Sequence, residues 1–461
     1  FIVTSDLNPR DKKSLSIALT LGAVAVPSTA LASSFQLLEQ SPAQMGKAFA
    51  GTASDITDAS TVYFNPAGMS RLEGTHLTLG GSAVFTEADF VNDGSSYSIN
   101  GNTVPVEGRA QTDETGFIPN AYWVTPLGDQ FTLGVGAGGP FGLSSDFGTD
   151  WPGRYSATYS ELEVMNFNVT TAWAPNDQFA FGLGVNYQRI DVTLESQFDS
   201  TLGLNPDPST DTGARIEGDD DDFVFDASVL WTPAPGTNVG LLWRQGGSFT
   251  LDGSANFDLN AACAPGAGLP TGAPPAPTTG TLCAGALATR EGNVAANAEL
   301  PDTLTLSASQ QLSERWTLHA DIAQTNWSSI QTIAVDNVDS GENVTELHPN
   351  YDDTLRLAIG ASYEFSDTMT WRFGVAKDEA PQTDPEYVSP RIPDEDRTWL
   401  AAGANMQLSE SVSLDVSYAH LMVDDAHLDR ADPTATGGSY NLEGRFDNSV
   451  SIVGAQVNWQ F

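Results

Sequence analysis

The segment Val453-Gly454-Ala455-Gln456-Val457-Asn458-Trp459-Gln460-Phe461 alternates, residue by residue, between apolar and polar side chains. Because successive side chains of a strand point to opposite faces, it predicts a strand with one apolar face and one polar face. A strand in a soluble sandwich shows the same alternation. The aromatic residues Trp459 and Phe461 at the end of this strand favour a transmembrane barrel, whose apolar face meets lipid.

Similar segments of alternating apolar and polar residues recur along the chain. The connections between them are alternately short and long. This layout is typical of an outer-membrane barrel, which has tight turns on one side and long loops on the other. We therefore predict an all-β fold, a closed antiparallel transmembrane barrel of about fourteen strands. The expected spans are 74–91, 114–126, 128–138, 155–174, 177–198, 213–232, 237–258, 292–312, 314–334, 351–366, 367–378, 395–409, 410–423 and 440–461.

Several tryptophans are predicted to lie at one level of this barrel, as an aromatic girdle at a membrane interface does. Those before short turns are Trp123, Trp173 and Trp231, and those after short turns are Trp316 and Trp371. The even strand number places the last strand's end on the same, periplasmic side.

The first residues read as a targeting segment followed by a plug. Lys12 and Lys13 precede a short apolar run and the sequence Ala30-Leu31-Ala32, which is typical of a signal peptide and its cleavage site. Residues 1–32 are therefore predicted to be an upstream extension and signal peptide. Residues 33–73 lack long alternation and are predicted to form a hatch with short helices inside the barrel, which occupies 74–461.

The charge and cysteine content of the chain limit the kinds of partner and ligand that it is expected to bind. The chain has 59 acidic and 19 basic residues, a net charge of −40, which argues against a nucleic-acid partner. Its two cysteines, Cys263 and Cys283, flank a Pro/Gly/Ala-rich stretch and are expected to form a disulfide that staples a loop. We expect no metal at these cysteines, since no histidine lies near them, and no cofactor.

Three stretches near the start of the chain carry a family resemblance. They are Ser34-Phe35-Gln36-Leu37, Met45-Gly46-Lys47-Ala48-Phe49-Ala50-Gly51, and Asp58-Ala59-Ser60-Thr61-Val62-Tyr63-Phe64-Asn65-Pro66-Ala67-Gly68-Met69. Together with Gly139-Pro140-Phe141-Gly142-Leu143, they resemble the FadL family of outer-membrane transporters of long-chain fatty acids and hydrocarbons. The resemblance implies a hatch-plugged barrel that passes hydrophobic molecules inward by diffusion.

The resemblance also implies roles for particular residues. Phe35 and Leu37 are expected to line the ligand slot, and the motif Asn65, Pro66 and Ala67 to fix the backbone of the hatch. A kink in the third strand is expected to open the barrel wall sideways. The residues assigned to this kink are Gly136, Gly138, Gly139, Pro140 and Phe141.

Strand phase points three arginines, Arg244, Arg356 and Arg372, into the lumen. They are candidates to receive a ligand carboxylate. The alternative is that they pair with lumen aspartates such as Asp226, Asp321 and Asp415 and brace the wall.

Transport of long-chain fatty acids or other hydrophobic compounds across the bacterial outer membrane is the predicted function. Uptake of aromatic or alkane hydrocarbons is the alternative within that class. A lipid hydrolase, a water-filled porin and an adhesive barrel are the rivals outside it; no nucleophile-elbow motif is found, and the expected plug disfavours a porin. We expect a non-enzymatic monomer that contacts outer-membrane lipids, lipopolysaccharide and the barrel assembly machinery.

Overall fold

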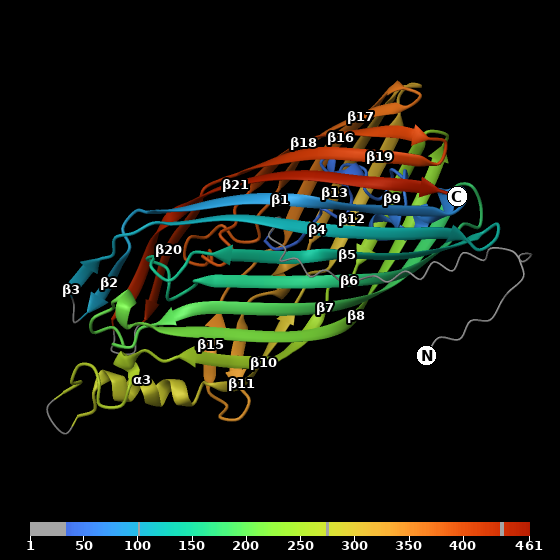
Figure 1. The fold of residues 1–461 in the computed structure, drawn as a ribbon. Coiled ribbons are helices and arrows are strands. Elements are labelled where there is room, and N and C mark those ends of the chain that lie inside the picture. Colours follow the sequence, from blue (N-terminus) through green and yellow to red (C-terminus); the bar gives the residue numbers. More distant parts are fainter. Residues whose placement is uncertain (1–33, 100–101, 273–275, 434–437) are drawn as a thin grey trace, which may run out of the picture.

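A computed structural model describes residues 34–99, 102–272, 276–433 and 438–461. Most of them lie in long antiparallel strands that form the wall of a barrel (Figure 1). The ring closes because β1 (His76–Asn92) pairs with β21 (Ser439–Gln460), from His76 opposite Gln460 to Asn92 opposite Gly444. The signal-peptide prediction for residues 1–32 lies outside the described residues.

The described strands occupy fourteen positions around the ring, as predicted. Four of these positions are each made of two strands in succession. They are β9 with β10, β11 with β12, β13 with β14, and β19 with β20. The first half of the wall comprises β1, β4 (Ala110–Pro126), β5 (Phe131–Asp146), β6 (Tyr159–Trp173), β7 (Phe179–Phe198), β8 (Thr212–Ala234), β9 (Thr237–Arg244) and β10 (Ser248–Asp258). The second half comprises β11 (Gly292–Glu299), β12 (Thr303–Gln311), β13 (Trp316–Thr325), β14 (Ile333–Asn337), β16 (Thr354–Ser366), β17 (Met369–Asp378), β18 (Arg397–Ser409), β19 (Val412–Val423), β20 (Ala426–Pro433) and β21.

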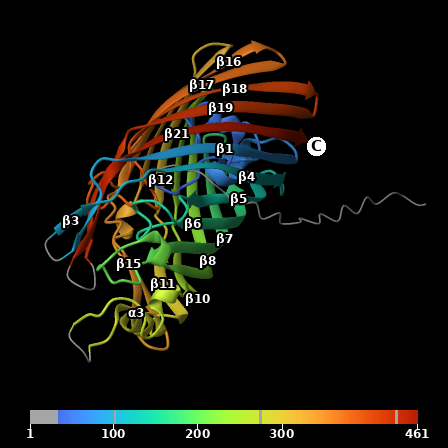
Figure 2. The same cartoon turned by 60° about the vertical axis from the view of Figure 1, so that its left-hand side comes forward.

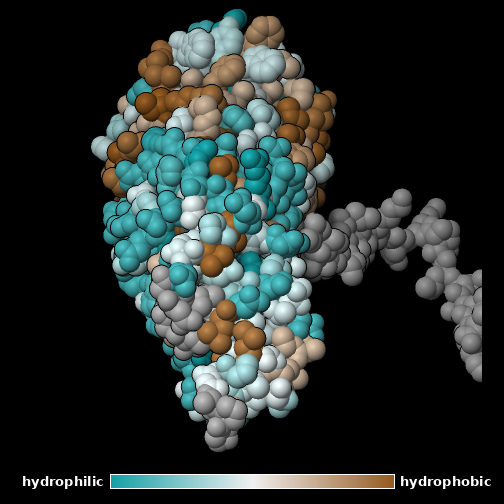
Figure 3. Space-filling view, turned by 90° about the vertical axis from the view of Figure 1, so that its left-hand side faces the viewer, coloured by the Kyte–Doolittle hydropathy of each residue, from teal (hydrophilic) through white to brown (hydrophobic). Residues whose placement is uncertain are grey.

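Smaller elements gather at the end of the barrel opposite the C-terminus (Figures 1 and 2). This end carries the long loops and presents a largely hydrophilic face with a few apolar patches (Figure 3). The elements of these loops are β2 (Ser96–Ile99), β3 (Asn102–Pro105), η2 (Pro208–Thr210), η3 (Ala261–Cys263), α3 (Thr279–Ala288) and β15 (Asn343–Leu347), whereas η4 (Trp327–Ser329) joins β13 to β14 within the wall. Among the described residues, no helix has both the length and the apolar character needed to cross a bilayer.

The outer face of the wall is apolar where the alternation predicts it. On β7 the exposed side chains are Phe179, Phe181, Leu183 and Val185, and their neighbours in the chain face inward. Trp173, Trp231, Trp316 and Trp371 are also exposed, and Trp231 stacks on Phe179 with ring centroids 6.2 Å apart. This belt and girdle give the barrel the surface of a protein that sits in lipid.

Residues 34–73, here called the interior segment, lie within the ring of strands (Figures 1 and 2). They contain α1 (Pro42–Met45), α2 (Thr61–Phe64) and η1 (Pro66–Arg71). Backbone amides of the segment donate to polar side chains on widely separated parts of the wall. The pairs are Gly51 with Asp321 (2.9 Å), Ala53 with Ser307 (3.0 Å), Ala59 with Thr78 (3.2 Å) and Ala67 with Ser228 (3.0 Å).

One strand boundary differs clearly from the prediction. The third strand was expected to end at 138, whereas β5 continues to Asp146. Beyond Gly138 its pairing with β6 resumes at Phe141 after a register shift, so the Gly-Pro run distorts the strand without ending it. The sequence pattern of this strand does not reveal the register shift between Gly138 and Phe141, which affects the candidate site.

Candidate ligand-binding site

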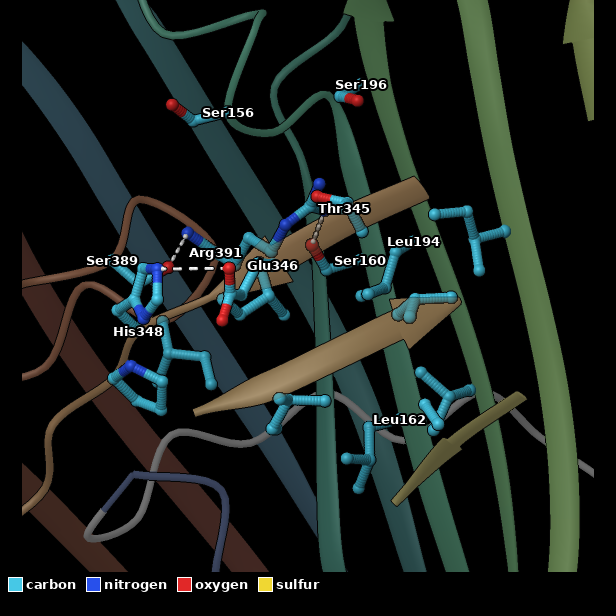
Figure 4. Close-up of a pocket in the computed structure, with 18 of the residues that line it drawn as sticks. Ser156, Ser160, Leu162, Leu194, Ser196, Thr345, Glu346, His348, Ser389 and Arg391 are labelled. Atoms are coloured by element: carbon cyan, nitrogen blue, oxygen red, sulfur yellow. Dashed lines mark hydrogen bonds and ion pairs between the residues drawn. The ribbon is translucent and has the colours of Figure 1, made fainter. Parts of the chain in front are cut away.

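A cavity of about 440 Å³ lies between the interior segment and the loops. Its walls are mainly aliphatic and come from β6, β7, β8, β10 and β11 (Figure 4). Representative lining residues are Leu162, Ile190, Val192, Leu194, Leu251 and Ile330. A cavity of this size with a mainly apolar surface suits an apolar small molecule, and the charged side chains that also line it, such as Glu161, Glu217 and Arg391, can orient a polar end group.

Aromatic rings close one end of the cavity. Phe35 of the interior segment lines it and packs edge-on against Trp327, with ring centroids 4.9 Å apart. Tyr351 also lines the cavity and contacts the other face of this cluster, with its ring 5.7 Å from that of Trp327. Leu37 was expected beside Phe35 in the slot. It is buried instead in a separate apolar cluster of the interior segment and the wall.

Arg391 is a buried cation in the cavity wall (Figure 4). Its Nη1 donates to the carbonyl of Tyr159 (3.1 Å), to Ser160 Oγ (3.0 Å) and to the carbonyl of Glu195 (3.1 Å). Its Nε has no hydrogen-bond partner, and no carboxylate among the described residues pairs with it. Burial, together with the charge of Arg430, lowers the pKa of Arg391 to about 10.

Two other basic side chains of the cavity lie near carboxylates. His348 Nε2 lies 3.8 Å from Glu346 Oε2, and His348 Nδ1 lies 3.3 Å from Thr332 Oγ1. Arg430 also lines the cavity; its Nε has no hydrogen-bond partner, but its Nη2 lies 3.7 Å from Asp432 Oδ1, so a carboxylate is already beside it. Arg391 is therefore the cavity's best-placed group for an anionic ligand.

None of the three arginines selected by strand phase lines the cavity. Arg244 donates to the carbonyl of Tyr63 and lies 3.8 Å above its ring. Arg356 donates to the carbonyl of Ala48. Arg372 forms an ion pair with Asp415, which is the bracing arrangement that the alternative reading described.

The Asn-Pro-Ala motif organises the interior segment. Asn65 caps η1, since its Oδ1 accepts from the amide of Ala67 (3.1 Å), and its Nδ2 donates to the carbonyl of Ala53 (2.5 Å). Pro66 occupies the first position of η1, where its missing amide proton costs no hydrogen bond. The motif is buried and lies outside the cavity.

Toward the long-loop end, β4 and β5 are not paired with each other. Pairing of β4 with β5 stops at Ala121 opposite Ala137, although β4 continues along β1 and β5 along β6. Of the residues assigned to the kink, Gly138, Gly139, Pro140 and Phe141 lie at this gap, whereas Gly136 still pairs with Tyr122 of β4. Each strand therefore presents backbone groups that its neighbour does not pair.

The interior segment covers the open edge of β5. Gln36 forms an antiparallel bridge with Phe141. The amide of Leu37 donates to the carbonyl of Pro140 (2.8 Å), and that of Gly142 donates to the carbonyl of Phe35 (2.9 Å). Gln40 Nε2 adds a bond to the carbonyl of Gly139 (2.6 Å). Phe35 is thus positioned at the cavity by a short strand added to the barrel wall.

Outside the cavity, Cys263 and Cys283 form a disulfide that joins η3 to α3. The bridge is buried in a small apolar cluster with Leu202 and Leu287. This cluster fixes the loop that follows β10 at the mouth of the barrel.

Sequence reasoning missed Arg391 because it lies in the loop between β17 and β18, where strand phase says nothing. The signal available was weak: a basic residue, in a chain that has few of them, between Pro390 and Ile392. Which wall such a loop residue meets depends on how the loop folds back into the barrel.

A closed barrel with an apolar outer belt, an internal segment and an apolar cavity defines a transport protein of the bacterial outer membrane. The family model described as outer membrane protein transport protein (OMPP1/FadL/TodX) matches residues 23–461. The chain belongs to this family.

Similar proteins agree with this assignment. The long-chain fatty acid transport protein of Escherichia coli K12 is 28% identical over 435 residues, which cover 89% of this chain and 92% of that protein. The crystal structure of a Pseudomonas aeruginosa FadL homologue superposes with a TM-score of 0.80 at 22% identity, covering 93% of this chain and all of that one. The toluene transporter TodX of P. putida gives a TM-score of 0.68 at 18% identity, covering 92% and 99% of the two chains.

Proposed function

We propose that this protein takes up long-chain fatty acids and binds them in the cavity with the carboxylate at Arg391. The observation that carries this proposal is a buried guanidinium without an acidic partner among the described residues, in a cavity whose surface is mainly apolar. A carboxylate there gains charge-assisted hydrogen bonds, while each buried methylene contributes about 0.8 kcal/mol. Toluene and alkanes would gain only the second contribution, so Arg391 favours fatty acids over the hydrocarbon alternative.

The likeness to named relatives supports the same ligand class. One relative is named a long-chain fatty acid transport protein and one structural neighbour a toluene transporter, so both apolar cargo types occur among similar proteins. We infer that the interior segment acts as a hatch, and that ligand leaves the cavity sideways through the gap between β4 and β5. Support for this exit is that Phe35 lines the cavity while its carbonyl bonds the edge of that gap.

Diffusion without chemical conversion is the mode of transport we propose. His348 is the histidine that lines the cavity, and among the described residues it hydrogen-bonds none of the lining serines. A serine hydrolase needs that contact to activate its nucleophile. The protein is further proposed to act as a monomer that contacts lipid and lipopolysaccharide through its outer belt and depends on the barrel assembly machinery for insertion.

Binding measurements on Arg391→Gln test the proposed function. Loss of a hydrogen bond to a charged group costs about 1.5–3 kcal/mol, which corresponds to a roughly 10- to 100-fold weaker affinity. We expect this loss for palmitate in lipid nanodiscs and an unchanged affinity for 1-hexadecanol. Arg315→Gln, which changes an exposed arginine in the turn between β12 and β13, is the matched control. Equal palmitate affinity in the two variants, or tighter binding of toluene than of palmitate, contradicts the proposal.

A further inference from the structure

A row of buried charges crosses three neighbouring strands inside the barrel. Arg356 on β16 lies opposite Asp378 on β17, and Asp378 lies opposite Arg397 on β18. Directly opposed residues on adjacent strands have Cβ atoms about 5 Å apart, so the three side chains lie side by side. All three are more than nine-tenths buried.

A carboxylate from the interior segment faces this row. Glu39 is 1% exposed and interacts electrostatically with both Arg356 and Arg397. The two arginines donate hydrogen bonds to groups other than Glu39: Arg356 to the carbonyl of Ala48, and Arg397 to the carboxylate of Asp394. Glu39 therefore holds its carboxyl group beside two cations, without a hydrogen bond from its side chain to either of them.

The hydrogen-bonding capacity of this group is only partly used. The buried atoms without a partner are Glu39 Oε2, Arg356 Nε, Asp378 Oδ2, and Arg397 Nε and Nη1. Buried guanidinium hydrogens without acceptors are costly, because they have lost water and gained nothing in exchange. The three unpaired nitrogens of Arg356 and Arg397 can donate hydrogen bonds to another carboxylate group, provided that Glu39 moves away.

The row is connected to the cavity through the start of the interior segment. The amide of Ser34 donates to Asp394 Oδ2 (2.6 Å), and Asp394 Oδ1 pairs with Arg397. Ser34 Oγ donates to the hydroxyl of Tyr351 (3.0 Å), which lines the cavity. Tyr351, Ser34 and Asp394 thus link the end of the cavity to Arg397.

We propose that Arg356 and Arg397 form a second carboxylate site, which Glu39 holds in this conformation and which the ligand's carboxylate takes over during passage. This inference rests on the proposed function, since it assumes that the cargo carries a carboxylate. Replacing one carboxylate by another leaves the net charge of the buried row unchanged, whereas adding an anion beside Glu39 would place one more negative charge in a medium of low dielectric constant.

Exchange at this site couples cargo arrival to opening of the wall. Glu39 is only two residues beyond Leu37, whose amide bonds the carbonyl of Pro140 at the edge of β5. Displacement of Glu39 therefore pulls on the short strand that covers the gap between β4 and β5. An uncharged molecule of the same length lacks the group that displaces Glu39, so it fills the cavity without releasing this strand.

Hydrogen exchange in the unsubstituted protein tests the inference directly. The amides of Leu37 and Gly142 form the two backbone hydrogen bonds between the covering strand and β5, so their exchange reports its release. In nanodiscs, we expect palmitate to speed exchange at both amides at least tenfold and 1-hexadecanol to leave it unchanged. Calorimetry on the same samples shows whether each ligand is bound.

Two variants sharpen this test. Glu39→Gln keeps the shape of the side chain and removes its charge, so exchange at Leu37 and Gly142 is expected to be about tenfold faster without ligand and to respond less than twofold to palmitate. Asp58→Asn is the matched control, because Asp58 is a buried carboxylate of the interior segment that bonds Ser60 and Gln456 instead of the row. Its exchange at the two reporting amides should equal that of the unsubstituted chain.

The outcomes separate the two proposals. If palmitate does not bind, the proposed function fails. If palmitate binds but exchange at Leu37 and Gly142 stays unchanged, the second site is refuted and the cavity proposal stands. Equal acceleration by 1-hexadecanol also overturns the carboxylate exchange. Should Glu39→Gln fail to insert, the comparison of the two ligands on the unsubstituted protein still decides.

Discussion

Substitution of Gly374 by alanine should loosen the interior segment while leaving the barrel closed. Gly374 lies on β17, and a Cβ atom there would be 2.0 Å from the carbonyl oxygen of Lys47 and 2.1 Å from its carbon. Both are backbone atoms, so no side-chain rotation relieves the overlap. The segment around Lys47 must move away from the wall by more than 1 Å to restore ordinary contact.

The size of the effect follows from overpacking, which costs about 1–3 kcal/mol in well-packed interiors. That cost corresponds to a roughly 5- to 150-fold increase in the population of a displaced segment. The wall should be spared, because its strands are held by pairing on both sides, here with β16 and β18. Because Lys47 forms an ion pair with Asp55, displacement should spread along the segment.

Two measurements check this prediction in nanodiscs. Amide exchange of residues 42–56 should accelerate by the stated factor, and single-channel recordings should show more frequent openings to small ions. Gly285→Ala is the control, since a Cβ atom at that position in α3 meets nothing within 4 Å. If Gly374→Ala exchanges and conducts like this control, the close packing of the segment on the wall is not what keeps it in place.

Two further predictions concern the start of the interior segment. Burial raises the pKa of Asp394 to about 6, although Arg397 opposes this rise, so between pH 4 and 6 the folded chain holds a proton that the unfolded chain has released. The free energy of unfolding relative to Asp394→Asn should therefore increase as the pH falls from 7 to 4, by up to roughly 3 kcal/mol; a flat difference in urea titrations contradicts this. The pair Gln36→Cys and Phe141→Cys should form a disulfide across the bridge between the segment and β5. It should block palmitate uptake into liposomes until a reductant is added, with the unsubstituted protein under the same reductant as control; uptake through the oxidised form would refute the lateral exit.

The ring of strands was predictable because lipid on one side and a polar interior on the other enforce alternation on every strand. Outward rows such as Phe179 to Val185 on β7 follow that rule directly. The continuation of β5 beyond Gly138 was not predictable, since glycine and proline are also what ends a strand. Here Pro140, which has no amide proton, lies on the part of β5 that is not paired with β4. Its carbonyl accepts a hydrogen bond from the amide of Leu37.

The candidate site was less accessible to sequence reasoning. Phe35 was identified through a resemblance, and it does line the cavity. Phase correctly pointed Arg356 and Arg372 inward, where both are buried, but inward direction does not say which partner a side chain meets. Arg372 meets Asp415 and Arg356 meets the interior segment, because both lie at the depth of that segment and not at the depth of the cavity.

The gap between β4 and β5 also bears on how such a chain avoids misassembly. An uncovered strand edge is a template for any passing β-strand, and within a bilayer each unsatisfied backbone group costs several kilocalories per mole. Here the edge at Gly139, Pro140 and Gly142 is satisfied by the chain's own first described residues. The segment that covers the exit therefore also keeps other strands from pairing with the edge of β5. A barrel without this segment is expected to pair at that edge with strands of other proteins or of other copies of the same chain in the membrane.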